Sequence, residues 1–211
     1  MAKYDDPRIL RAIAHPARNR ILSELYASGS LRAADVGRIL DIPANQASFH
    51  LRQLAKYGLV EEAPEEARDK RDRVWRMAPE DGVSFRTSDV LAQPGGEAAV
   101  EVYRHSARAW GHHLVDRSLT EDKDGETFVF NSALRLSQEE VAEYASDIEA
   151  LNKRWHERTR GQNDGRTTYS TYMLIQPYPE LPQDAEDPED PQAAEDAQPA
   201  EAAGPAEADA G

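Results

Sequence analysis

The chain of 211 residues contains no cysteine. Disulfide bonds, thiolate metal sites and cysteine nucleophiles are therefore excluded. The sequence also lacks any apolar run near the twenty or so residues that a membrane span requires. Its first residues lack the apolar core of a signal peptide. We therefore expect a cytoplasmic protein that has no membrane partner.

Common catalytic motifs are absent as well. The sequence has no glycine-rich phosphate loop, no G-x-S-x-G elbow and no H-E-x-x-H metal motif. The pair His156-Glu157 is not followed by a second histidine at the spacing that a metalloprotease needs. We expect no enzyme activity and no cofactor.

The net charge of −14 is distributed unevenly. Residues 1–80 hold 14 basic and 12 acidic side chains, whereas residues 184–211 hold 10 acidic side chains and no basic one. The latter segment has no aromatic residue and no valine, isoleucine or leucine, so burial cannot offset its chain entropy, and we predict a disordered acidic tail. The tail has two possible roles: solubility, or competition with nucleic acid for a basic face. The acidic balance of the whole chain does not exclude a nucleic-acid partner.

The first 80 residues contain closely spaced helix signals. Asp6-Pro7 is an N-cap and first-turn pair. Pro16 begins a second helix that Gly29 closes, and a third helix, with Val36, Ile39 and Leu40 inward, follows a lone strand residue at position 31. Asp41-Ile42-Pro43 predicts a tight turn before a fourth helix over residues 44–57, and Gly58 is a natural stop because glycine adopts the left-handed conformation at little cost.

A charged hairpin follows these helices. Leu59-Val60-Glu61-Glu62 and Arg73-Val74-Trp75-Arg76-Met77 are typical of two strands, and a polar turn separates them. Helices followed by such a hairpin predict a winged helix-turn-helix domain over residues 1–80, with the wing at 61–77.

The helix at 44–57 has two different faces. Ala47, Leu51 and Leu54 form an apolar stripe that packs on the preceding helices. The opposite side contains no acidic residue, and its amide, guanidinium and aromatic groups are suited to base edges and thymine methyls in a major groove. An ordinary solvated helix face usually carries Glu or Asp. The DNA-contacting residues that we predict on this helix are Asn45, Gln46, Ser48, Phe49, Arg52 and Lys56.

The hairpin supplies a second group of basic residues. Four predicted phosphate contacts lie near its tip, and four acidic residues alternate with them, so a solvated hairpin is the alternative interpretation. The predicted contacts are Arg68, Lys70, Arg71 and Arg73.

Three stretches of sequence together resemble the ArsR-type winged-helix regulators of bacteria. They are R-I-L-R-A-I-A-H-P-A-R-N-R-I-L-S-E-L, the turn D-I-P, and A-S-F-H-L-R-Q-L-A-K-Y-G-L-V. The similarity spans residues 7 to about 78. The resemblance implies a cytoplasmic homodimer that binds a two-fold operator in double-stranded DNA and usually represses transcription.

The middle region, residues 97–181, is predicted to be an α+β dimerisation or effector domain. Pro94-Gly95-Gly96 breaks the chain before a helix with one apolar face, and Ser137-Gln138-Glu139-Glu140 is a capping box that opens a helix with heptad-like apolar spacing. Residues 127–130, 133–136 and 167–175 have the composition of strands. The whole chain is thus expected to be α+β, ending in the disordered tail at 184–211.

Two helices offer surfaces for a dimer. The N-terminal helix and the helix after the glycine pair each carry an apolar face with little to cover it in a small winged domain. The residues predicted at the dimer interface are Ile9, Leu10, Ile13, Tyr103 and Trp110.

The main prediction is a DNA-binding regulator that holds no metal. Two alternatives to it remain open. His112 and Asp116 share a helix face and are possible zinc ligands across a dimer, as in a metal- or ligand-responsive sensor of this family. The acid–histidine spacing of such sites is not reproduced, so no metal site is predicted. The second alternative is a winged helix used as a protein-interaction module, which the acid-free face argues against.

Overall fold

The computed structural model describes residues 5–67, 73–79, 82–83, 85–120, 127–162 and 165–180. The chain divides into two units, Met1–Met173 and Leu174–Gly211. Of the second unit only residues 174–180 are described, and they contain no helix or strand. The predicted disordered tail lies outside the described residues. No helix in the described ranges is long and apolar enough to cross a membrane.

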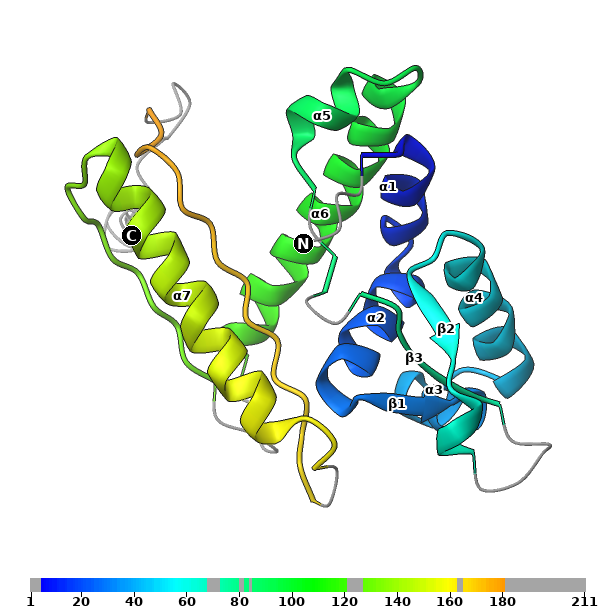
Figure 1. The fold of residues 1–211 in the computed structure, drawn as a ribbon. Helices are drawn as coiled ribbons and strands as arrows, with labels where there is room; N and C mark the ends of the chain where they lie inside the picture. The colour runs from blue at the N-terminus through cyan, green and yellow to red at the C-terminus, as the bar shows by residue number, and fades with distance from the viewer. Residues whose placement is uncertain are drawn as a thin grey trace, which may run out of the picture. The chain divides into compact units, whose positions relative to one another are not determined.

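Four helices and a small sheet form the N-terminal domain (Figure 1). The predicted caps are confirmed: Asp6 accepts a hydrogen bond from the backbone N–H of Arg8 at 2.8 Å, and Gly29 and Gly58 both adopt positive φ angles. The elements are α1 (Pro7–Ile13), α2 (Pro16–Ser28), β1 (Ser30–Arg32), α3 (Ala33–Leu40), α4 (Ala44–Lys56), β2 (Val60–Glu62), the 3-10 turn η1 (Pro64–Glu66) and β3 (Val74–Met77).

The three strands form one antiparallel sheet in the order β1-β3-β2. Val60 pairs with Met77 and Glu62 pairs with Trp75, while Leu31 pairs with Trp75 from the other side. The wing is thus joined through β3 to the strand that connects α2 to α3. Trp75 is buried because its central strand is covered by helix α2.

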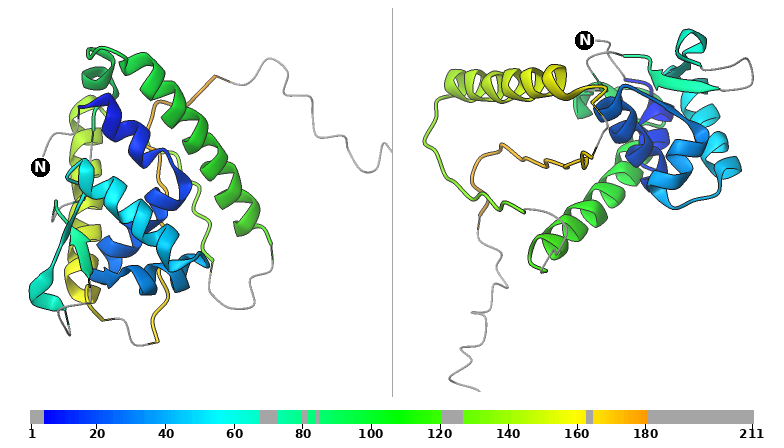
Figure 2. Two further views of the ribbon diagram at one scale, coloured as in Figure 1. Left: turned by 90° about the vertical axis from the view of Figure 1, so that its right-hand side faces the viewer. Right: turned by 90° about the horizontal axis from the view of Figure 1, so that it is seen from below.

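The core of the domain continues beyond the wing. Helix α5 (Thr87–Leu91) and helix α6 (Gly96–Ser118) follow, and α6 packs against α1. Val90, Ala99 and Val100 are buried in the same cluster as the leucines of α2 and α4. The buried residues of α6 lie near its start, and the rest of this helix runs past the domain (Figure 2).

Helix α7 (Gln138–Thr159) begins at the predicted capping box. Ser137 Oγ accepts from the Glu140 N–H at 3.2 Å, and a Glu140 carboxylate oxygen accepts from the Ser137 N–H at 2.6 Å. No residue of α7 is buried.

The strands predicted at 127–130, 133–136 and 167–175 are wrong for this structure. The described residues there are extended chain without a strand ladder, and after the wing the described chain contains only α5, α6 and α7 as regular elements. The α+β description of residues 97–181 is corrected accordingly. A β-rich composition shows that a segment can pair, but a strand forms only where a second strand satisfies its backbone groups.

Candidate nucleic-acid interface

The helix-turn-helix depends on a close approach between α3 and α4. Asp41 ends α3 in the left-handed conformation (φ 53°), and the Ile42 N–H donates to the Gly37 carbonyl at 2.9 Å. A Cβ atom at position 37 would lie 2.8 Å from the Ile42 carbonyl oxygen. Only glycine fits this position without a shift of the turn, and the turn sets the direction in which α4 leaves.

Helix α4 presents a continuous exposed stripe. Its inward stripe of Ala47, His50, Leu51 and Leu54 is buried. Ser48 is half-buried and Gln46 is exposed beside the outer stripe, and Phe49 keeps 49% of its surface exposed. The outer stripe follows the spacing i, i+4, i+7 and i+11, and its exposed residues are Asn45, Phe49, Arg52 and Lys56. All six predicted residues of this helix are thus solvent-accessible.

The cationic groups of the stripe are available to a ligand. Across the described residues, neither Arg52 nor Lys56 forms an ion pair. Lys56 lies 5.9 Å from the centroid of the neighbouring Tyr57 ring. A basic side chain that is exposed and not neutralised gains more binding free energy from a phosphate or a guanine edge than a basic side chain that is already paired with a carboxylate.

The wing differs from α4 in this respect. Of the four basic residues predicted there, Arg68, Lys70 and Arg71 lie outside the described residues. Arg73 is exposed, and its guanidinium lies 3.5 Å from a Glu62 carboxylate oxygen.

Arg76, at the base of the wing on β3, binds acidic side chains of β2 and of the 3-10 turn η1 that follows it. Its guanidinium contacts Glu61 at 2.7 Å and also contacts Glu65. The hydrogen bond that Arg76 donates to the Glu61 carboxylate is the main reason that the pKa of Arg76 is raised. In the described part of the wing, four acidic side chains outnumber two basic ones, so α4 supplies the cationic surface.

A buried histidine, His50, and the half-buried His15 beside it support α4 from behind. The rings of His15, at the start of α2, and His50 lie 4.8 Å apart, and His50 is only 4% exposed. Neither ring nitrogen of His50 has a hydrogen-bond partner among the described residues. The Nδ1 atom of His15 has none there either. Burial lowers the pKa of both histidines, and the positive charge of Arg18 lowers them further.

This pair predicts a loss of stability in mild acid. The unfolded chain takes up protons below a pKa of about 6.5, whereas the folded domain resists them. The free energy of unfolding should therefore fall as the pH drops from 7 through 6.5 towards 5. His50→Leu should reduce this fall, as measured by urea denaturation at each pH. The matched control His112→Leu, on the exposed part of α6, should keep it, and equal pH dependence in both variants would contradict the assignment.

The burial of His50 has a signal in the sequence. Position 50 falls within the inward stripe, three residues after Ala47 and four before Leu54. A polar side chain at such a position is expected to be buried, and we predicted only the apolar members.

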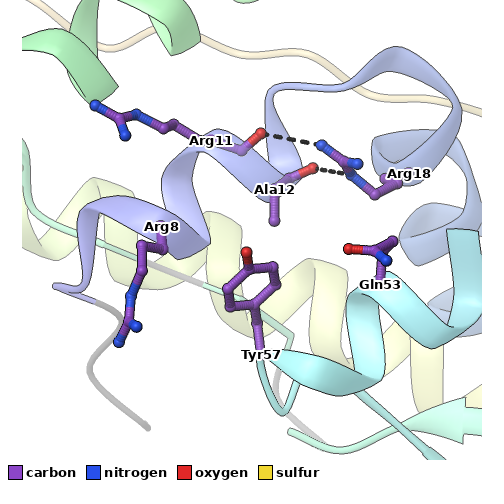
Figure 3. A pocket seen from close by; sticks show the side chains of 6 residues that line it. All are labelled: Arg8, Arg11, Ala12, Arg18, Gln53 and Tyr57. Atoms are coloured by element: carbon purple, nitrogen blue, oxygen red, sulfur yellow. Dashed lines mark hydrogen bonds between the residues drawn. The ribbon is translucent and has the colours of Figure 1, made fainter.

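A small hollow of about 180 Å³ lies between α1, α2 and the end of α4 (Figure 3). Three arginines line it, but their guanidinium groups diverge. Arg18 donates to the Ala12 carbonyl at 2.6 Å, and Arg8 pairs with Asp6 at 2.7 Å. Arg11 points towards α6, 3.5 Å from the Gly95 carbonyl. Because these groups close the end of α1 and tie it to its neighbours, they do not converge on an anion.

The predicted dimer residues differ in exposure. Leu10 and Ile13 are buried in the core of their own chain, and Ile9 is half-buried. Tyr103 is half-buried and meets the Phe85 ring edge-on at 5.0 Å. Trp110 keeps 39% of its surface exposed. The accessible part of the predicted surface is therefore the Trp110 face of α6.

The histidines of α6 have no metal-binding arrangement in the described chain. His112 and Asp116 are exposed, and within the described ranges no three histidine or carboxylate side chains lie close enough to hold one ion.

The N-terminal part of the chain is similar to known helix-turn-helix proteins. Residues 13–63 match a family model described as a helix-turn-helix domain. Over 51 residues the chain is 37% identical to the transcriptional repressor PagR of Bacillus anthracis, a match that covers 24% of this chain and 52% of that protein. The chain thus matches about half the length of this relative.

Several solved structures are similar at low identity. The YusO protein of Bacillus subtilis is 14% identical, with 70% of this chain and 83% of that chain covered and a TM-score of 0.31. ZitR of Lactococcus lactis, in a mutant apo form, is 15% identical, with coverage of 67% and 83% and a TM-score of 0.29. MarR of E. coli in its apo form is 14% identical, with coverage of 70% and 87% and a TM-score of 0.31.

The helices, the small antiparallel sheet and the matched residues define a winged helix-turn-helix domain, the DNA-binding class of fold found in transcription regulators. The domain is of the ArsR type, so the resemblance inferred from the sequence is confirmed.

Proposed function

We propose that the protein is a sequence-specific DNA-binding transcription regulator that acts as a homodimeric repressor on a palindromic operator. The observation that carries this proposal is the exposed, acid-free stripe on α4. Its basic side chains Arg52 and Lys56 form no ion pair among the described residues. A convex helix face of amide, aromatic and guanidinium groups fits the major groove, whose base edges offer matching donors and acceptors. The similarity to a transcriptional repressor supports the sign of regulation.

The dimer is required by the length of the site. One recognition helix contacts too few base pairs to select a site in a genome, whereas a two-fold dimer reads half-sites about 34 Å apart. The exposed Trp110 face of α6 supports self-association by this domain.

Binding to duplex DNA tests the proposal directly. Fluorescence anisotropy with a random duplex should show an affinity that falls steeply as salt is raised, because Lys and Arg contacts release counterions from the phosphates. Binding that is absent at low salt, or that does not respond to salt, would instead favour a winged helix that binds protein.

The variant Arg52→Ala tests the recognition face. On an operator selected from a random library, the loss should be on the order of 1–3 kcal/mol and confined to one position of each half-site if Arg52 contacts guanine. Arg104→Ala is the matched control, because Arg104 is an exposed arginine on α6 that pairs with Glu101 at 2.6 Å. An Arg52→Ala protein with unchanged affinity for every sequence would show that another face of the domain binds DNA.

A further inference from the structure

Helix α7 has an apolar stripe that is only partly covered within the described chain: Tyr144 and Ile148 are half-buried, and the other stripe residues are exposed. Its 22 residues include no buried side chain. Leu151 and Trp155 are 43% and 50% exposed, respectively. The stripe follows the alternating spacing of three and four residues that is typical of a helix paired with another helix, and it consists of Val141, Tyr144, Ile148, Leu151 and Trp155.

The charges of α7 are separated along its length. Five acidic residues occupy the stretch from 139 to 149, and the three bases all lie from 153 onward, with Glu157 the one acidic residue among them. Two copies side by side in parallel would bring like charges together. In an antiparallel pair, the acidic end of each helix meets the basic end of the other.

We propose that α7 pairs with α7 of a second copy of this chain as an antiparallel two-helix coil. The charge separation indicates which partner covers the stripe. A second α7 that runs in the opposite direction has the complementary distribution of charge. The acidic tail at 184–211 is unsuited to the stripe, since it has no large apolar side chain. This interface goes beyond the proposed function and does not depend on DNA.

The heptad positions fix the register. Centring the two-fold axis between residues 149 and 150 packs Ile148 against the partner's Leu151 and Tyr144 against the partner's Trp155. Asp147 and Arg154 flank the stripe on one side, so each Asp147 then faces the partner's Arg154. Within the described chain neither side chain forms an ion pair, and both are exposed.

The segments around α7 fit the same arrangement. Antiparallel pairing brings the segment that precedes α7 in one copy to the end where the other copy's chain leaves its helix. Both segments are extended and have no ladder partner in one described chain. They also hold exposed aromatic residues, with Phe128, Phe130 and Tyr169 between 66% and 89% exposed. Together with Trp155 and Tyr172, these rings offer roughly 600 Å² per copy, close to the ~800 Å² that a stable interface buries on each side.

Disulfide cross-linking tests the pairing in the full chain, which contains no cysteine of its own. Chains carrying Ile148→Cys and Leu151→Cys, co-expressed with tags of different size, should form a mixed disulfide dimer at least tenfold faster than the outward-facing pair Ser146→Cys and Lys153→Cys. Equal rates for the two pairs would overturn the proposal. A faster homodimeric disulfide from Ile148→Cys alone would show parallel helices and would also overturn it.

A charge exchange gives a second measurement on the same cysteine pair. Asp147→Arg alone and Arg154→Asp alone should each slow the cross-linking several-fold, and the double variant should restore the rate. Residues 147 and 154 are two turns apart on one helix, so restoration cannot come from contact within a chain. Slowing without restoration would contradict the register. Because no DNA is present, failure here leaves the proposed function standing, and absence of DNA binding leaves this interface standing.

Discussion

Alanine at position 37 is expected to destabilise the N-terminal domain by about 1–3 kcal/mol and to abolish operator binding. The added Cβ would lie 2.8 Å from the Ile42 carbonyl oxygen and 3.4 Å from the Ala44 Cα atom. Both neighbours are backbone atoms, so relief requires a movement of the turn and not of a side chain. A shifted turn redirects α4, and the exposed stripe then no longer meets the groove at both half-sites. Urea denaturation and anisotropy with the operator measure the two effects.

Gly111→Ala provides the matched control. Gly111 also lies inside a helix, but a Cβ there would meet only the Tyr172 ring, at 4.0 Å. Because alanine is favoured over glycine in a helix by roughly 0.8–1 kcal/mol, this variant should be unchanged or slightly more stable. If Gly37→Ala also gained stability, the close approach of α3 to the turn would be disproved.

Glutamate at position 110 is expected to weaken the proposed DNA-binding dimer at its α6 interface. Trp110 is the exposed aromatic residue on the predicted dimer face of α6, and tryptophan at the centre of an interface commonly contributes 2 kcal/mol or more. A loss of about 2 kcal/mol weakens self-association roughly thirtyfold, and affinity for a palindrome should fall at least as much because both half-sites must be held together. Sedimentation and anisotropy on one preparation measure both quantities.

His112→Glu is the control for this variant. His112 lies on the opposite side of α6 and is exposed, so the same new charge should leave self-association and operator binding unchanged. We chose a single substitution at 110 because Tyr103 packs against Phe85 within its own chain. A charge at 103 would damage the domain itself. A Trp110→Glu protein whose self-association and affinity for the palindrome are both unchanged would contradict the assignment of this face.

The N-terminal fold was predictable because its signals are local. The ends of three helices are set by proline, which fixes φ and lacks an N–H group, by a capping aspartate, and by glycine, which adopts a positive φ. These residues are Asp6-Pro7, Pro16 with Gly29, and Pro43 with Gly58. The exposed stripe of α4 was equally predictable. Its exposed positions follow from the helical period once the buried stripe is known, and the absence of acidic residues is visible in the sequence.

Other features depend on contacts that composition does not contain. Residues 127–136 and 167–175 have strand-forming side chains, yet a strand needs a partner that the described chain does not supply. The burial of Leu10 and Ile13 follows from the packing of α6 against α1, which joins residues some ninety positions apart. The contact between His15 and His50 is likewise a product of tertiary packing, because nothing near either residue marks the other.

The shared strand β3 has a consequence for how DNA affinity can be controlled. β3 pairs with the wing strand β2 on one edge and with β1, at the root of α3, on the other. Because β2 also follows α4 along the chain and contacts it, the base of the hairpin and α4 should move together, and under the proposed function a signal should not withdraw one of them from DNA while the other stays bound. In the proposed dimer, control of affinity is then expected to act on the spacing between the α4 helices of the two copies. Substitutions that alter the joint between α1 and α6 should therefore change the preferred separation of half-sites before they change the sequence that each half-site requires.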